Sequence, residues 1–124
     1  KHISEIFSVE DLIPSAGQGV ISLQCRDNDE ETISLLKNTN HKETYQRVSA
    51  ERNVLKVLEG DCETAVGAHA LVNENIITLE AELFSLDGTK RFYEKKSSDV
   101  KDAKKLGQEV GKILKFKSNN SYKK

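Results

Sequence analysis

The stretch AVGAHALVNENIITLEAELFSLDGTKRFYEK, residues 65–95, decides the fold. It contains three strand-like runs, over residues 65–72, 76–85 and 90–95. Residues 73–75 separate the first two runs, and Asp87 with Gly88, a dipeptide typical of hairpins, separates the last two. Connections this short join strands that lie side by side, so the stretch predicts an antiparallel meander.

Helical patterns flank the meander. Before it, residues 42–59 carry an apolar stripe at helical spacing, formed by Tyr45, Val48, Leu55 and Leu58. Asn40 and Glu43 have capping-box spacing, and Gly60 is placed to end this helix. Ser98 or Asp99 caps a last helix, whose predicted buried face consists of Val100, Ala103, Leu106, Val110, Ile113 and Leu114. This order predicts an α+β fold: a three-stranded antiparallel sheet packed with helices.

Residues 1–38 have the features of a remnant of preceding domains. Residues 13–20, IPSAGQGV, indicate a hinge, and residues 20–25 alternate like a short strand. Asn28 or Asp29 caps a helix over residues 30–38, yet no partner strand lies close by in the sequence. We therefore expect a remnant over 1–38, a complete domain over 39–118 and a frayed polar tail over 119–124. The chain contains no methionine and starts within a pattern, as expected of a piece of a longer protein.

Composition excludes several classes of protein. The 19 basic and 20 acidic residues leave a net charge of -1, which argues against general binding to nucleic acid or anionic membranes. No apolar run reaches the roughly 18 residues of a membrane span, and no export leader opens the chain, so a soluble cytoplasmic protein is expected. His2, His41 and His69 are scattered without metal-ligand spacing, so no metal site is expected.

Two cysteines, Cys25 and Cys62, are too isolated to indicate a disulfide framework. Cys62 lies between the end of the predicted helix and the first strand. The helix C-terminus and the acids Glu59, Asp61 and Glu63 all oppose ionisation of its thiol, so we expect its pKa to be at or above that of free cysteine. These surroundings argue against a redox thiol or a thiol hydrolase, which would also need a histidine such as His69 within reach.

Two roles for Cys62 remain open on these grounds. Free cysteines are commonly packed as small apolar residues. A thiol can also react once with a strong cationic electrophile and hold the product covalently, because the electrophile then supplies the driving force.

Three segments resemble hydroxymethylbilane synthase, also called porphobilinogen deaminase. They are AGQGVISLQCR (16–26), LLKNTNHKETYQRVSAERNVLKVLEGDCETAVGAHALV (35–72) and SLDGT (85–89). The resemblance runs from about Asp11 to Gly88, with a weaker match in the last helix. It implies a transferase of porphyrin and heme biosynthesis, which joins four porphobilinogen molecules with release of ammonia into the linear tetrapyrrole hydroxymethylbilane.

The resemblance also implies roles for individual residues. Cys62 corresponds to the family's cysteine that holds the dipyrromethane cofactor through a thioether, and Gln18 and Gly19 match hinge residues that contact the cofactor or the growing chain. Asp61 and Glu63 depart from the family's usual Gly and Gln beside the cysteine. Residues 39–118 would be the family's third domain.

The family's catalytic aspartate and carboxylate-binding arginines belong to its first two domains, so no catalytic residue is expected in this chain. Arg52, beside Glu51, is expected to form only a local ion pair. The chain alone should be inactive and should lack dipyrromethane, whereas the full-length enzyme is expected to be a monomer. Without its parent sheet, the predicted strand over residues 20–25 should be disordered, be repacked on the third domain, or pair with another copy of the chain. The alternative function is a non-catalytic interaction domain with a packed free thiol.

Overall fold

A computed structural model describes residues 2–59 and 64–124. The predicted meander and both flanking helices are confirmed, as is the helix that Asp29 caps. In chain order the elements are α1 (Glu30–Lys37), α2 (Lys42–Leu58), β1 (Val66–Asn73), β2 (Ile76–Phe84), β3 (Arg91–Asp99), a 3-10 turn (Val100–Asp102) and α3 (Ala103–Ser118).

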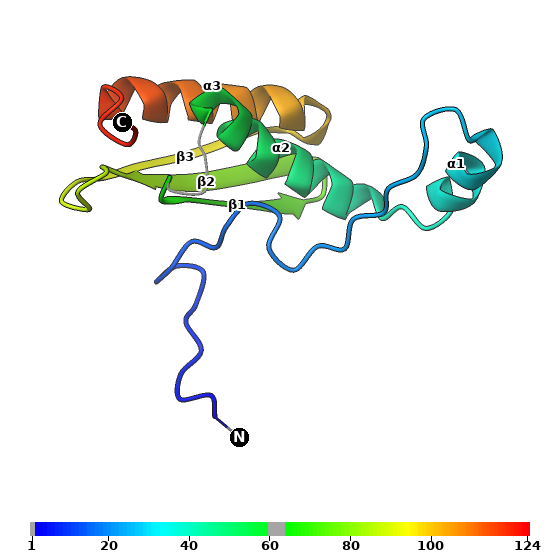
Figure 1. Cartoon of the computed structure of the whole chain (residues 1–124), viewed down its shortest axis with the longest axis horizontal. Coiled ribbons are helices and arrows are strands. Elements are labelled where there is room, and N and C mark those ends of the chain that lie inside the picture. Colours follow the sequence, from blue (N-terminus) through cyan, green and yellow to red (C-terminus); the bar gives the residue numbers. More distant parts are fainter. Residues whose placement is uncertain (1, 60–63) are drawn as a thin grey trace.

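The three strands form one antiparallel sheet in the order β1-β2-β3. Helices α2 and α3 cover one face of this sheet, while α1 stands away from it and buries no residue (Figure 1). The other face, which no helix of the described residues covers, carries polar contacts: Glu82 pairs with Arg91 at 2.7 Å, and Glu80 accepts a hydrogen bond from Tyr93. The fold is therefore the predicted α+β layer with one covered face.

The core lies between the sheet and the two helices. Its buried members are Ala50, Val54, Leu58, Ala68, Ala70, Ile77, Leu79, Ala81, Leu83, Ala103, Leu106, Val110, Leu114 and Tyr122. Four of the six residues predicted for the buried face of α3 are in this set, and Val100 and Ile113 are half-buried. On α2 the prediction for Tyr45 is wrong, because its side chain is 66% exposed and the smaller Ala50 faces the core instead.

The helix and loop ends differ from prediction in detail. His41, not Asn40, caps α2, because its Nδ1 accepts the backbone N–H of Thr44. Glu59 takes the left-handed conformation that ends α2, while Gly60 lies outside the described residues. In the β2–β3 turn, hydrogen bonds from the Ser85 hydroxyl and the Thr89 backbone N–H lower the pKa of Asp87 to about 2.

Two predictions for the ends of the chain are wrong. Residues 20–25 form no strand, because no strand of the described residues lies beside them to complete a ladder. Ile21 and Leu23 accordingly remain 88% and 61% exposed. The tail after α3 is not frayed along its whole length: Tyr122 is 2% exposed and donates a hydrogen bond to the Leu58 carbonyl.

Candidate functional site

Residues 13–19, which we call the crossover segment, lie against the edge of β1. The backbone carbonyl of Pro14 accepts the Ala68 N–H at 2.9 Å, so the segment covers part of the open edge of the sheet. Ile13 packs on Gly67 so closely that a Cβ at position 67 would be 2.6 Å from the Ile13 carbonyl oxygen. Glycine at this position of β1 therefore permits the segment to dock.

Glu51 joins the crossover segment to the same edge from the side of α2. Its side chain is buried, and its two carboxylate oxygens accept the backbone N–H groups of Gly17 at 2.8 Å and of Ala70 at 2.9 Å. The expected ion pair with Arg52 is wrong, because Glu51 points inward while Arg52 is exposed on the helix. One carboxylate thus connects α2, β1 and the crossover segment.

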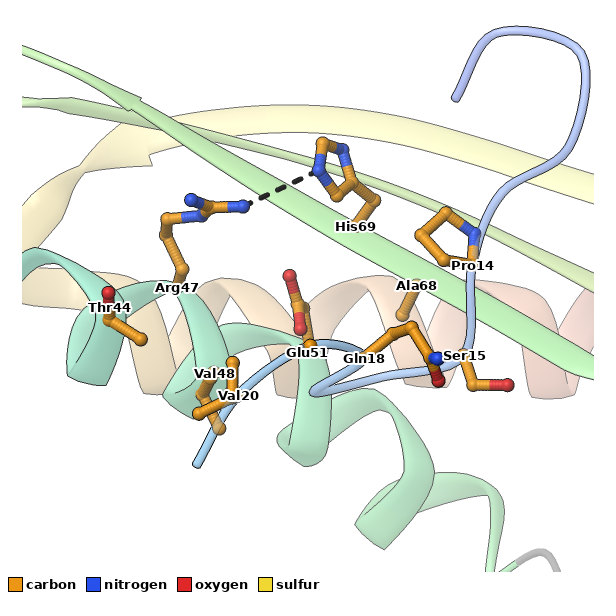
Figure 2. A pocket seen from close by; sticks show the side chains of 11 residues that line it. Pro14, Ser15, Gln18, Val20, Thr44, Arg47, Val48, Glu51, Ala68 and His69 are labelled. Carbon is orange, nitrogen blue, oxygen red and sulfur yellow. Dashed lines mark hydrogen bonds between the residues drawn. The ribbon is translucent and has the colours of Figure 1, made fainter. Parts of the chain in front are cut away.

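Beside Glu51 lies a cavity of about 310 Å³ (Figure 2). Arg47 donates from Nε to the Ala70 carbonyl at 2.6 Å, and its Nη2 lies 3.5 Å from Nε2 of His69. A guanidinium only donates, so Nε2 of His69 is the accepting atom in this contact, and the other ring nitrogen is Nδ1. That Nδ1 is buried and has no hydrogen-bond partner within the described part of the chain.

Gln18 and Gly19, two residues singled out from the sequence, line this cavity. Gly17 and Gly19 both have φ of 76°, a backbone conformation that suits glycine. The exposed Gln18 side chain has no hydrogen bond to any described residue, so its amide is free to meet a ligand. Arg47, Glu51 and His69 were not predicted for the site. Arg47 and Glu51 bind backbone atoms that only the fold brings close, and His69 contacts Arg47, 22 positions away in the sequence.

Cys62, the third predicted site residue, lies outside the described residues. The residues on either side of its connection are described: α2 ends at Leu58, and β1 begins at Val66. At the end of α2, Lys115 donates to the Glu59 carboxylate at 3.1 Å and to the Val57 carbonyl at 3.4 Å. Lys123 of the tail lies 3.7 Å from the same carboxylate.

These two lysines change the charge at the end of α2. The hydrogen bond from Lys115 holds the pKa of Glu59 below its usual value, and Lys123 adds to the effect. Glu59 is therefore a paired carboxylate, and the lysines also oppose the negative end of the helix dipole. The expectation for the thiol pKa of Cys62 stays a prediction, because Cys62 lies outside the described residues.

Neither a metal centre nor a membrane helix emerges from the part of the chain that the structure describes. Across residues 2–59 and 64–124, no group of three or more His, Cys, Asp or Glu side chains is placed to hold a metal ion. Within the same ranges, no helix is both long and apolar enough to cross a membrane.

Comparison with known proteins gives the family. Residues 45–115 match the family described as "Porphobilinogen deaminase, C-terminal domain". The chain belongs to this family. The porphobilinogen deaminase of Desulforamulus reducens is 41% identical over 112 residues, which cover 90% of this chain and 36% of that protein. Those of Chloroherpeton thalassium and Brevibacillus brevis are 37% and 41% identical, over 89% and 90% of this chain and 36% of each relative.

The chain thus spans about a third of the length of these relatives, 36% in each case. The match to the family's C-terminal domain takes in most of α2, the whole sheet and most of α3. Cys62 and the cavity residues Arg47, Glu51 and His69 fall inside the matched range, whereas the crossover segment precedes it. Tyr122 follows it.

Proposed function

We propose that this chain is the cofactor-carrying part of a hydroxymethylbilane synthase and that Cys62 is the attachment point. The full-length transferase would join four porphobilinogen molecules, with release of ammonia, on a covalently held dipyrromethane primer. One observation carries the proposal: residues 45–115 match the family's C-terminal domain, and Cys62 falls in that range between α2 and β1. The chemistry of polymerisation is assigned to the part of the relatives that this chain does not span.

In this proposal Cys62 forms one bond. Its sulfur would replace the amino group of one porphobilinogen, so that a thioether to the methylene carbon forms and ammonia leaves with the thiol proton. A second porphobilinogen, joined to the free pyrrole carbon with loss of a second ammonia, would complete the two rings of the dipyrromethane. When bound, the dipyrromethane supplies the pyrrole carbon from which the chain grows. This reaction needs little activation of the thiol, which agrees with a cysteine placed after a helix C-terminus.

The residues around the cavity fit a group that carries carboxylates. Arg47 uses Nε and one Nη2 proton in the contacts described above, so the rest of its guanidinium can donate to an anion. Gln18 lines the same cavity, and its amide has no hydrogen-bond partner among the described residues. We propose that Gln18 and the backbone of Gly19 contact the cofactor or the growing chain, and that residues 1–38, 39–118 and 119–124 are the hinge remnant, the cofactor-carrying domain and the tail.

Mass spectrometry of the full-length protein tests the attachment, with the chain's other cysteine as a matched control. A dipyrromethane-sized adduct is expected on the peptide that contains Cys62. Cys62→Ser should remove the adduct completely, whereas Cys25→Ser should leave its stoichiometry unchanged.

An unmodified Cys62 peptide in the active full-length protein would contradict the proposal and favour the alternative, a non-catalytic interaction domain with a packed thiol. The 124-residue chain alone is expected to carry no adduct and to leave porphobilinogen unchanged, since the family's catalytic acid and carboxylate-binding arginines belong to its other domains.

Residues 20–25 give the isolated chain a route to self-association. Ile21 and Leu23 are exposed, and the backbone around them pairs with no strand in the described part of the chain, so we expect two copies to pair along this segment at high concentration. Sedimentation equilibrium should show a concentration-dependent dimer that the double substitution Ile21→Lys and Leu23→Lys abolishes. Phe116→Lys, at an 86% exposed position of α3, is the control and should leave the dimer unchanged. A chain that stays monomeric at every concentration would refute this expectation.

A further inference from the structure

Glu51 is an unusual residue for the face of α2 that it occupies. Its side chain is only 5% exposed, and no lysine or arginine of the described residues forms an ion pair with it. Removing a carboxylate from water is costly unless hydrogen bonds compensate for the lost hydration. An apolar side chain would fill this position of the helix at lower cost. The position of Glu51 therefore calls for an explanation beyond the stability of α2.

The two hydrogen bonds of Glu51 supply that explanation. Oε1 accepts from Ala70, 19 positions along the chain, and Oε2 accepts from Gly17, 34 positions away. We propose that Glu51 is a positioning residue, which holds the crossover segment on the edge of β1 and thereby holds Gln18 at the cavity. The role of Gln18 rests on the proposed function, whereas the hydrogen bonds of Glu51 do not.

Backbone hydrogen bonds around Gln18 connect its position to the contact between Glu51 and Gly17. Gly17, whose N–H is bound by Glu51, directly precedes Gln18. The Gln18 N–H donates to the Ser15 carbonyl at 3.0 Å, and the Val20 N–H donates to the Gly17 carbonyl at 3.2 Å, so two consecutive turns fix the path of the chain. Because the Gln18 side chain has no hydrogen bond of its own to a described residue, its place depends on the backbone.

The contacts of the crossover segment divide into two groups along its length. Ile13 and Pro14 dock its beginning, through Gly67 and the Ala68 N–H. Glu51 docks its end at Gly17. Loss of the Glu51 carboxylate should therefore release the Gln18 end and leave the beginning of the segment in place. A general loss of stability would release both ends together.

Amide hydrogen exchange in the full-length protein tests this difference. Glu51→Gln keeps the size of the side chain but leaves a single acceptor oxygen for two N–H donors. We expect the Gly17 and Ala70 amides to exchange about tenfold faster or more, since a hydrogen bond to a charged group is lost or weakened. The Ala68 amide, bound to Pro14, should keep its rate. Glu43→Gln, at an exposed position on the first turn of α2, removes the same charge and should change none of the three.

Two outcomes of the exchange experiment would overturn the inference. One is an unchanged rate at Gly17 in Glu51→Gln. The other is equal acceleration at Gly17 and Ala68, which would mean that Glu51 acts only through the stability of the whole domain.

A double-mutant cycle on the full-length enzyme tests the link to Gln18. If Glu51 acts through Gln18, Glu51→Gln should slow porphobilinogen consumption in the parent protein but add little in a Gln18→Ala background. If Glu51→Gln slows the reaction by the same factor in both backgrounds, the two residues act independently, and the proposed link between Glu51 and Gln18 is wrong. A full-length protein without an adduct on Cys62 would contradict the proposed function only. The positioning role of Glu51 is tested separately, because the exchange rates at Gly17 and Ala68 are measured without substrate.

Discussion

Replacing Gly107 with alanine should lower the free energy of unfolding by about 3 kcal/mol, although Gly→Ala inside a helix normally stabilises it by about 1 kcal/mol. The reason is the close approach of α3 to α2. A Cβ on Gly107 would overlap the Ala50 carbonyl oxygen and lie 2.9 Å from the Asn53 Cβ. A backbone carbonyl within a helix cannot move aside alone, so the two helices would have to separate and open the core around Ala50 and Leu106.

Gly111, one turn further along α3, supplies a graded comparison. A Cβ there would lie 2.9 Å from the Val57 Cβ and 3.1 Å from the Val54 carbonyl oxygen, so the overlap is smaller. We expect a loss of about 1 kcal/mol for Gly111→Ala, since overpacking is partly offset by helix propensity. Lys112→Ala, at an exposed position of the same helix, is the control for propensity and should be close to neutral.

Urea unfolding of the three variants, followed by far-ultraviolet circular dichroism, measures these differences as shifts in the midpoint at constant slope. A Gly107→Ala protein as stable as the parent would mean that α2 and α3 do not approach as closely as described.

The parts of the fold that the sequence predicts are those that depend on local pattern. The strand-like runs and short turns in residues 65–95 predict three strands, because successive side chains of a strand point to opposite faces. Asp29 predicts the start of α1, because its side chain caps the helix. On α2 the apolar stripe predicts the wrong orientation for Tyr45. Ala50 and Glu51 occupy the inner face instead, and neither is apolar enough to be recognised in the sequence as a core residue.

The candidate site was predicted only in part, for a related reason. Gln18 and Gly19 came from a family resemblance, and the structure places both beside a cavity. Arg47 and Glu51 bind backbone atoms of β1 and of the crossover segment, which are distant in sequence. Contacts of this kind leave no spacing in the sequence, because any residue supplies a backbone N–H or carbonyl.

The tail after α3 was also mispredicted from the sequence, because a single buried tyrosine in a polar segment gives no periodic pattern to recognise. Asn119 and Asn120 both adopt left-handed backbone conformations, with φ of 47° and 57°, and turn the chain back toward α2. Asparagine tolerates this region better than most residues. The pair of asparagines after a helix was the available signal that the chain reverses here rather than frays.

Tyr122 should therefore contribute strongly to stability, although it lies beyond the residues matched to the family. Its ring packs in the core, and its hydroxyl donates to the Leu58 carbonyl at 2.8 Å, at the end of α2 that leads toward Cys62. Tyr122→Ala should cost about 3–4 kcal/mol of unfolding free energy, because it empties a large buried volume. Tyr122→Phe should cost about 1–2 kcal/mol, because the ring remains but the buried carbonyl loses its donor.

Tyr45→Ala is the matched control for this prediction. It makes the same chemical change on α2 at a side chain that is 66% exposed, so its effect should stay within about 0.5 kcal/mol. Urea unfolding separates the three variants. If Tyr122→Ala proves as mild as Tyr45→Ala, the tail is not part of the core. If Tyr122→Phe proves as costly as Tyr122→Ala, the hydrogen bond to Leu58, and not the buried ring, supplies most of the stabilisation at this end of α2.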